Sequence, residues 1–178
     1  YMLARGAVSQ GPTEVVRLMQ RSQKKPQVLY FCLAAIAKFE LHETEMGLCS
    51  KEATACILQT LKTLNKYPKI PALVAQSLVA LVSLADNYAN RSVILKEEWC
   101  RLVVAAINNL TTESQEVIVH HADGNEKVVV RTATRQSCDI AANGLRLFGV
   151  FACDPKLREE FADDAIKCSL RSSIHFSG

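Results

Sequence analysis

Three stretches of the chain share one arrangement of small and large apolar positions. In each, a small residue is followed directly by a large apolar one, and a second large apolar residue comes three positions later. The sets are Ala35, Ile36 and Phe39; Ala80, Leu81 and Leu84; and Gly144, Leu145 and Phe148. Such spacings bring side chains to one helix face, and a small residue there lets a neighbouring helix approach closely. The pattern predicts long helices over residues 32–39, 77–84 and 141–148 that stack against one another.

Shorter apolar patterns follow each of these stretches. They form pairs of a short and a longer segment: residues 45–49 and 56–61, residues 90–95 and 101–107, and residues 154–161 and 165–170. Pro26 and Pro71 stand where the first turn of a helix tolerates proline, and Ser50 is a suitable N-cap residue. Each unit is therefore predicted to hold a long, a short and a medium helix. Trp99, at the start of one medium helix, is predicted to pack in the core.

Residues 116–131 break the helical pattern. Two runs of β-branched residues, 117–119 and 128–130, flank the sequence Asp123-Gly124-Asn125. Asp-Gly between such runs is a strong signal for a hairpin turn, so we expect a β-hairpin or a mobile insertion here. Two interpretations stay open. The segment is a variable insertion between repeats, or it pairs with a partner or a second copy, because an isolated hairpin is marginally stable and exposes strand edges.

Composition supports a globular, helical chain. Of its 178 residues, 49% are hydrophobic and 22% charged, which excludes wholesale disorder. Only 7 glycines and 5 prolines are present, and so few turn residues favour long helices over many short strands. The net charge of +3 is too small for a dedicated nucleic-acid-binding domain, so nucleic acid is disfavoured as a partner.

The cysteines and the longest uncharged stretch bear on the cellular compartment. Seven cysteines occur at irregular spacings without a Cys-x-x-Cys motif, which argues against a disulfide framework or a zinc ribbon. We therefore expect a reducing compartment, the cytoplasm or the nucleus. Residues 70–85 carry no charge but fall short of the ~18–20 residues that cross a bilayer, so no membrane insertion is expected.

No constellation of residues indicates catalysis. The sequence lacks a glycine-rich phosphate-binding loop, and the adjacent His120 and His121 would point to opposite faces of a strand. No cysteine stands in a local sequence that would activate it as a nucleophile. We expect a protein that is not an enzyme and holds no cofactor or metal.

The repeated unit resembles the armadillo repeat. A unit of roughly 42 residues with three helices, a small-Leu-x-x-Leu core and a short helix of the Asn90-Arg91-x-x-Ile94 type is similar to that family, and the two-helix HEAT repeat is the nearest alternative. The likeness extends over about residues 12–172. It implies one all-α domain, a right-handed solenoid with units at 12–65, 66–110 and 132–172 and an insertion at 111–131. Because apolar helices are predicted at both ends, we expect a fragment of a longer protein.

The resemblance also implies where a partner would bind. Armadillo proteins bind extended peptides on the concave face formed by successive long helices, and importin-α-like members carry a Trp and an Asn on each. In this chain those positions hold Ala34, Val79 and Asn143, and Lys38, Ser83 and Leu147, so basic nuclear-import cargo is disfavoured. The candidate partner-binding residues are Tyr30, Lys38, Val79, Ser83, Asp139 and Asn143. The alternative is ordinary surface between repeats.

These observations predict a protein–protein interaction scaffold or adaptor that binds a partner segment on the concave face. Two alternatives stay open: a regulatory repeat domain of a larger enzyme, and a nucleic-acid-binding solenoid. Self-association through the repeat ends or the hairpin is a further expectation. The basic stretch at residues 21–25 is either a solvated loop or a contact for phosphate or the nuclear-import machinery.

Overall fold

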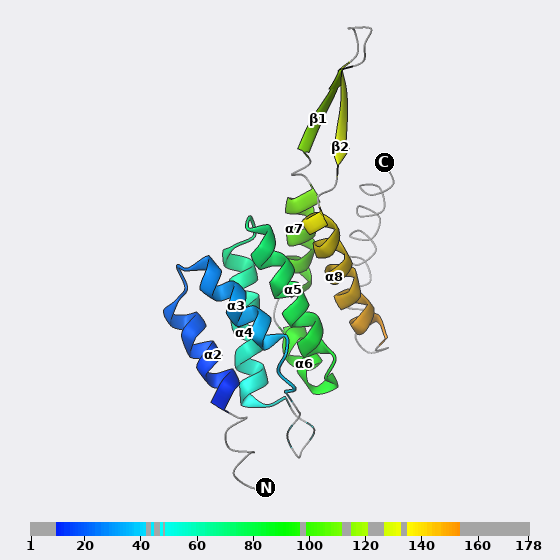
Figure 1. The fold of residues 1–178 in the computed structure, drawn as a ribbon. Coiled ribbons are helices and arrows are strands. Elements are labelled where there is room, and N and C mark those ends of the chain that lie inside the picture. Colours follow the sequence, from blue (N-terminus) through cyan, green and yellow to red (C-terminus); the bar gives the residue numbers. More distant parts are fainter. Residues whose placement is uncertain are drawn as a thin grey trace.

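The computed structural model describes residues 10–41, 44, 47, 49–96, 99–111, 115–120, 127–132 and 135–153. In this part of the chain seven helices and two strands form (Figure 1). They are α2 (Gln10–Arg21), α3 (Pro26–Ile36), α4 (Lys51–Lys66), α5 (Pro71–Ala85), α6 (Tyr88–Lys96), α7 (Trp99–Thr111), β1 (Gln115–His120), β2 (Lys127–Thr132) and α8 (Arg135–Ala152). The helical body agrees with the predicted all-α class.

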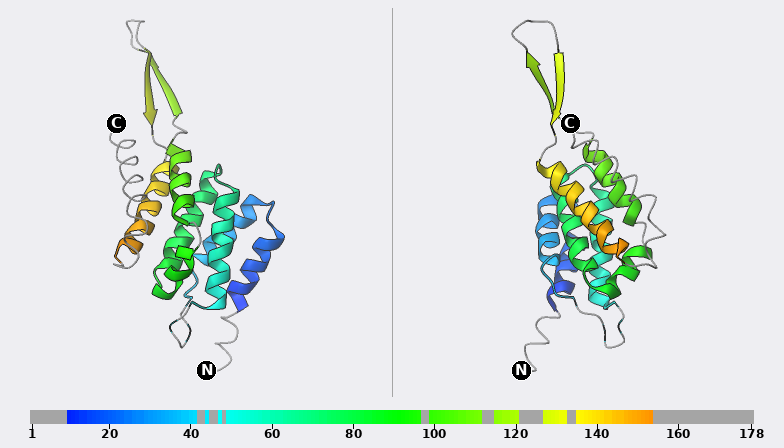
Figure 2. Two further views of the ribbon diagram at one scale, coloured as in Figure 1. Left: turned by 180° about the vertical axis from the view of Figure 1, so that it is seen from behind. Right: turned by 90° about the vertical axis from the view of Figure 1, so that its right-hand side faces the viewer.

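The helices stack in two layers. One layer contains α3, α5 and α8, in which α5 contacts both of its neighbours. The other contains α2, α4 and α7, with α4 in the middle. Contacts between α2 and α3, α4 and α5, and α7 and α8 join the layers, and views from opposite sides bring different helices to the front (Figures 1 and 2). The short α6 packs against α4, α5 and α7.

Local signals set most helix starts as expected. Pro26 and Pro71 lie in the first turns of α3 and α5. The Oγ of Ser50 accepts a hydrogen bond from the backbone N–H of Ala53 at 3.1 Å and caps α4. The predicted short helix at 45–49 is wrong at its described positions: Gly47 has a φ of 67°, a left-handed conformation that a helix of L-residues does not continue through.

Close approach of α7 and α8 confirms the role predicted for the small position at Gly144. A Cβ added there would lie 2.5 Å from Cδ1 of Ile107 and 3.3 Å from Cγ1 of Val103. Ala80, at the corresponding position of α5, is fully buried. Ala35 on α3 is only partly buried, because α3 lies at the edge of its layer.

Aromatic residues fill the core between α7 and α8. Trp99 is 2% exposed, which confirms its predicted place in the core. Its ring stacks on Phe151 with centroids 4.5 Å apart and meets Phe148 at 5.4 Å. Stacked and tilted aromatic pairs of this kind stabilise beyond the area that they bury.

The two strands form an antiparallel pair between α7 and α8. Val117 is paired with Val130, and Val119 with Val128. Both views show the pair projecting beyond the helical layers (Figures 1 and 2). The turn predicted at Asp123-Gly124-Asn125 lies outside the described residues, as do His121 and the helices predicted at 154–161 and 165–170.

Candidate functional site

The six residues predicted to bind a partner all belong to the α3–α5–α8 layer or its margin, but they do not form one cluster. Tyr30 lies in the middle of α3, and Lys38 follows the end of that helix, roughly two helical turns away. Val79 and Ser83 are half-buried on α5. Asp139 and Asn143 belong to α8 on the far side of α5.

Two of the predicted polar side chains are already bonded within the protein. The hydroxyl of Ser83 donates to the carbonyl of Ala37 at 2.9 Å and so ties α5 to the end of α3. The side-chain amide of Asn143 donates to the carbonyl of Asp139 at 2.8 Å, one turn back on α8. Both bonds lower the capacity of these groups to recognise a partner.

Tyr30 does border a pocket, an apolar groove between the first turns of α3 and α5. The groove has a volume of about 350 Å³. Its lining residues are Pro26, Gln27, Tyr30 and Phe31 of α3 and Ile70, Ala72 and Leu73 at the start of α5. Gln27 supplies the one amide side chain of this wall, so the groove offers mainly apolar surface.

Two adjacent aromatic rings line one side of the groove. Phe31 is 71% exposed and Tyr30 is 37% exposed. Their rings meet edge to face, with centroids 5.6 Å apart and planes at 83°. An exposed phenyl ring beside an apolar hollow is the kind of surface that marks interaction sites.

Hydrogen bonds hold the turns at this end of the molecule in place. The Tyr67 hydroxyl and the Lys66 ammonium group, which precede α5, both donate to the carbonyl of Gln23 in the turn before α3, the latter at 3.2 Å. The α2–α3 and α4–α5 turns are thereby joined, which fixes the spacing of the two helix ends that form the groove.

The groove lies at a strongly basic end of the helical layers. Lys25 directly precedes Pro26, and Lys69 directly precedes Ile70, so a cation borders each wall of the groove in sequence. Lys24 immediately precedes Lys25, and all three lysines are exposed. Within the described residues none of the three has an acidic partner.

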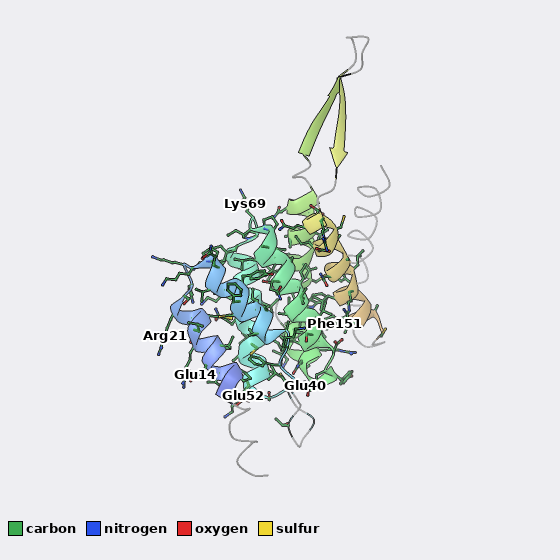
Figure 3. All side chains as sticks on the ribbon, in the orientation of Figure 1. Glu14, Arg21, Glu40, Glu52, Lys69 and Phe151 are labelled. Atoms are coloured by element: carbon green, nitrogen blue, oxygen red, sulfur yellow. The ribbon has the colours of Figure 1, made fainter. Side chains whose placement is uncertain are left out.

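Acidic side chains lie elsewhere. Residues 15–39 and residues 53–85 contain no Asp or Glu. The carboxylates that bracket these ranges are Glu14, Glu40, Glu52 and Asp86. Figure 3 shows Glu14, Glu40 and Glu52 at the end of the layers opposite Lys69, so the carboxylates that flank α3 and α4 lie away from the groove.

The buried cysteines of α3 and α4 are not activated as nucleophiles. Burial, together with the charge of Glu52, raises the pKa of the Cys56 thiol to about 12. Burial also raises the pKa of Cys32 on α3. Both thiols therefore stay protonated near neutral pH. Among the described residues no group of three or more His, Cys, Asp or Glu side chains could hold a metal ion.

Phe31, Ile70 and Leu73 were not among the predicted site residues, although the sequence contains a signal for them. Residues 28–36 form an unbroken apolar run, and a surface helix ordinarily carries a polar face. Such a helix at the edge of an array must expose part of its apolar surface. The acid-free ranges around it are a second signal.

None of the described helices combines the length and apolar character needed to span a bilayer.

Comparison with known proteins identifies no relative: no family model, no curated protein and no solved structure matches the chain. The groove and the charged residues around it are therefore the features of this chain that bear on its function.

Proposed function

We propose that this chain is a protein-interaction module that holds a segment of a partner protein on the outer face of the α3–α5–α8 layer. The observation that carries the proposal is the groove of about 350 Å³ beside the 71%-exposed ring of Phe31. This volume is near the lower end of the ~300–1,000 Å³ typical of ligand pockets, so it fits one or two anchoring side chains better than an enclosed ligand.

The apolar surface extends beyond the groove along the same layer. Ala34 on α3 and Ala75 and Val79 on α5 are each partly exposed. Small side chains at these positions leave room for a partner backbone to lie close to the helices. An anchor in a pocket surrounded by weaker contacts is the usual anatomy of a protein interface.

The layers are compatible with the armadillo-like arrangement proposed from the sequence. The 9 residues of α6, the 13 of α7 and the 18 of α8 follow the short, medium, long order of that repeat. The pairs α4–α5 and α7–α8 each contribute one helix to each layer. An experimental structure in which one pair superposes on the other by a right-handed rotation about the layer axis would test this assignment.

The interaction proposal is tested by selecting short peptides from a display library against the purified chain. We expect selected peptides to lose at least about tenfold in affinity on Phe31→Ala, because truncating an anchor contact in a central pocket commonly costs this much. Tyr88→Ala is the matched control, since Tyr88 is a 62%-exposed aromatic residue on α6, away from the groove.

Unchanged folding of both variants is checked by circular dichroism. Peptides that bind equally to the wild type and to both variants would place recognition outside the groove. Failure to select any peptide that depends on Phe31 contradicts the proposed function.

A further inference from the structure

We infer that the partner segment held in this groove is acidic, with one or two large apolar side chains as anchors flanked by Asp or Glu. The inference rests on the proposed function and adds the chemistry of the ligand. Its basis is an apolar groove that lies beside several lysines, between helices whose ranges 15–39 and 53–85 contain no carboxylate.

The charges around the groove favour an acidic ligand. The cations at or near this end are Lys24, Lys25, Lys62, Lys66 and Lys69. All five are exposed. Lys24, Lys25 and Lys69 come from the two turns that frame the groove, and Lys62 and Lys66 come from the last two turns of α4. Opposite potentials across an interface guide association and select among partners, so this end favours a negatively charged segment.

The backbone adds positive potential at the same place. Both α3 and α5 begin at this end of the layers, and neither has a side-chain hydrogen bond at its N-cap, Lys25 or Ile70. The N-terminal end of a helix carries a partial positive charge from its unpaired N–H groups. The partial positive charge of these two helix ends adds to the positive potential of the lysines.

The apolar lining of the groove distinguishes a peptide from other anions. Pro26, Ile70 and Leu73 offer no hydrogen-bonding side chain to a base or a phosphate placed in the groove. Burying unsatisfied polar groups is costly, whereas an aliphatic or aromatic side chain fits this lining. A segment that places apolar anchors inside and carboxylates outside satisfies both the groove and the lysines around it.

The charge pattern also disfavours a long polyanion along the layer. Glu40 and Asp86 lie at the opposite ends of α3 and α5, and the exposed Asp139 belongs to α8. A nucleic acid that continued beyond the basic end would meet these carboxylates. An acidic peptide that ends or turns neutral there would not.

The test uses a short synthetic peptide with two leucine anchors flanked by glutamates, and its matched counterpart with lysines in place of the glutamates. Binding to the full chain is measured by fluorescence anisotropy. We expect the acidic peptide to bind more tightly than the basic one, and its affinity to fall as salt rises from about 0.1 M to about 1 M, because screening weakens contacts between exposed charges.

The double variant Lys25→Glu/Lys69→Glu should weaken binding of the acidic peptide about tenfold or more, since two attractive contacts become repulsive. The control is Lys51→Glu/Lys96→Glu, which makes the same change in net charge at two exposed lysines outside the basic end. We expect this control to retain most of the affinity.

The outcomes separate the inference from the proposed function. If peptides depend on Phe31 but acidic ones have no advantage, or if both charge variants act equally, the inference is wrong and the interaction module stands. If no peptide depends on Phe31, both fail. Preferential binding of a single-stranded RNA or of anionic vesicles, abolished by Lys25→Glu/Lys69→Glu while the acidic peptide does not bind, would overturn the inference in favour of a different anion.

Discussion

The aromatic residues on the two sides of α5 differ in burial. Toward α8, Trp99, Phe148 and Phe151 turn inward and fill the space between helices. Toward α3, Phe31 and Tyr30 turn outward and leave a groove between the helix starts. One architecture thus produces a sealed interface on one side and an open one on the other. The candidate binding surface therefore arises where α3, at the edge of the layer, carries more apolar side chains than α5 can cover.

The largest change in stability is expected from a comparison of one buried and one exposed aromatic residue. Replacing Trp99 by alanine should lower the free energy of unfolding by about 3–5 kcal/mol, because it empties a fully packed site. The change Phe31→Ala should alter it by less than about 0.5 kcal/mol, as is usual for exposed positions. Urea denaturation followed by circular dichroism measures both values. Similar losses in the two variants would show that Phe31 is part of the core.

A pair of glycines on α8 tests how closely α7 and α8 approach. Nothing lies within 4 Å of a Cβ built at Gly149, so Gly149→Ala should stabilise by about 0.5–1 kcal/mol through helix propensity. The same change at Gly144 forces Ile107 and Val103 to move, and overpacking of this kind costs about 1–3 kcal/mol. Thermal unfolding of the two variants should therefore show Gly144→Ala to be the less stable. Equal melting temperatures would contradict the close contact.

A smaller effect is expected where the turns beside the groove are joined. The change Tyr67→Phe removes the hydroxyl that donates to the Gln23 carbonyl and should cost about 1 kcal/mol, the usual net value of a hydrogen bond. We also expect weaker binding of groove peptides, because the two helix starts are less firmly spaced. Equilibrium denaturation and the peptide assay give the two readings, and Ser83→Ala, which removes a bond at the other end of α3, is the control.

The smallest effect concerns reactivity rather than stability. The thiols of Cys138 and Cys153 are exposed, whereas Cys56 is buried with its pKa raised to about 12. Because the thiolate is the nucleophile, a thiol reagent at pH 8 should label Cys138 and Cys153 rapidly and Cys56 only after unfolding. Mass spectrometry of labelled peptides reports each site. Rapid labelling of Cys56 in the folded protein would show that α4 opens readily.

A related pH dependence follows from Cys56. Its pKa is higher in the folded state than in the unfolded chain, so the folded state holds the proton more tightly. The associated stability is complete below the unfolded value and is lost as pH rises toward about 12. Urea denaturation at several alkaline pH values should show the free energy of unfolding falling as pH rises. The fall should be smaller in Cys56→Ala, and the difference is the contribution of Cys56.

Local sequence rules were most informative for features that depend on residues within one helical turn. Ser50 caps α4, Pro26 and Pro71 lie in first turns, and Gly144 takes the close contact that its place in the repeated pattern predicts. The short helix expected at 45–49 is the counterexample at its described positions. There the apolar spacing of the segment indicated a helix, but Gly47 adopts a left-handed conformation.

The candidate site was predicted only in part. Tyr30 borders the groove, but Ser83 and Asn143 bond to carbonyl groups of their own protein, and Phe31 was missed. Helical spacing places residues on a face of their own helix. It does not state which neighbour covers that face, nor which carbonyl a hydroxyl will reach from another helix.

Local sequence was enough to predict the helical class, most helix starts and the small residues that permit close stacking, because these depend on side-chain size and backbone propensity within a few residues. The separation of charge was also present in the sequence, as two long ranges without a carboxylate. By contrast, the packing of distant segments places the starts of α3 and α5 side by side. Pro26 and Phe31 thereby line a groove with Ile70 and Leu73, beside Lys25 and Lys69. That arrangement depends on contacts between residues more than forty positions apart, such as Tyr67 with Gln23, which no local pattern specifies.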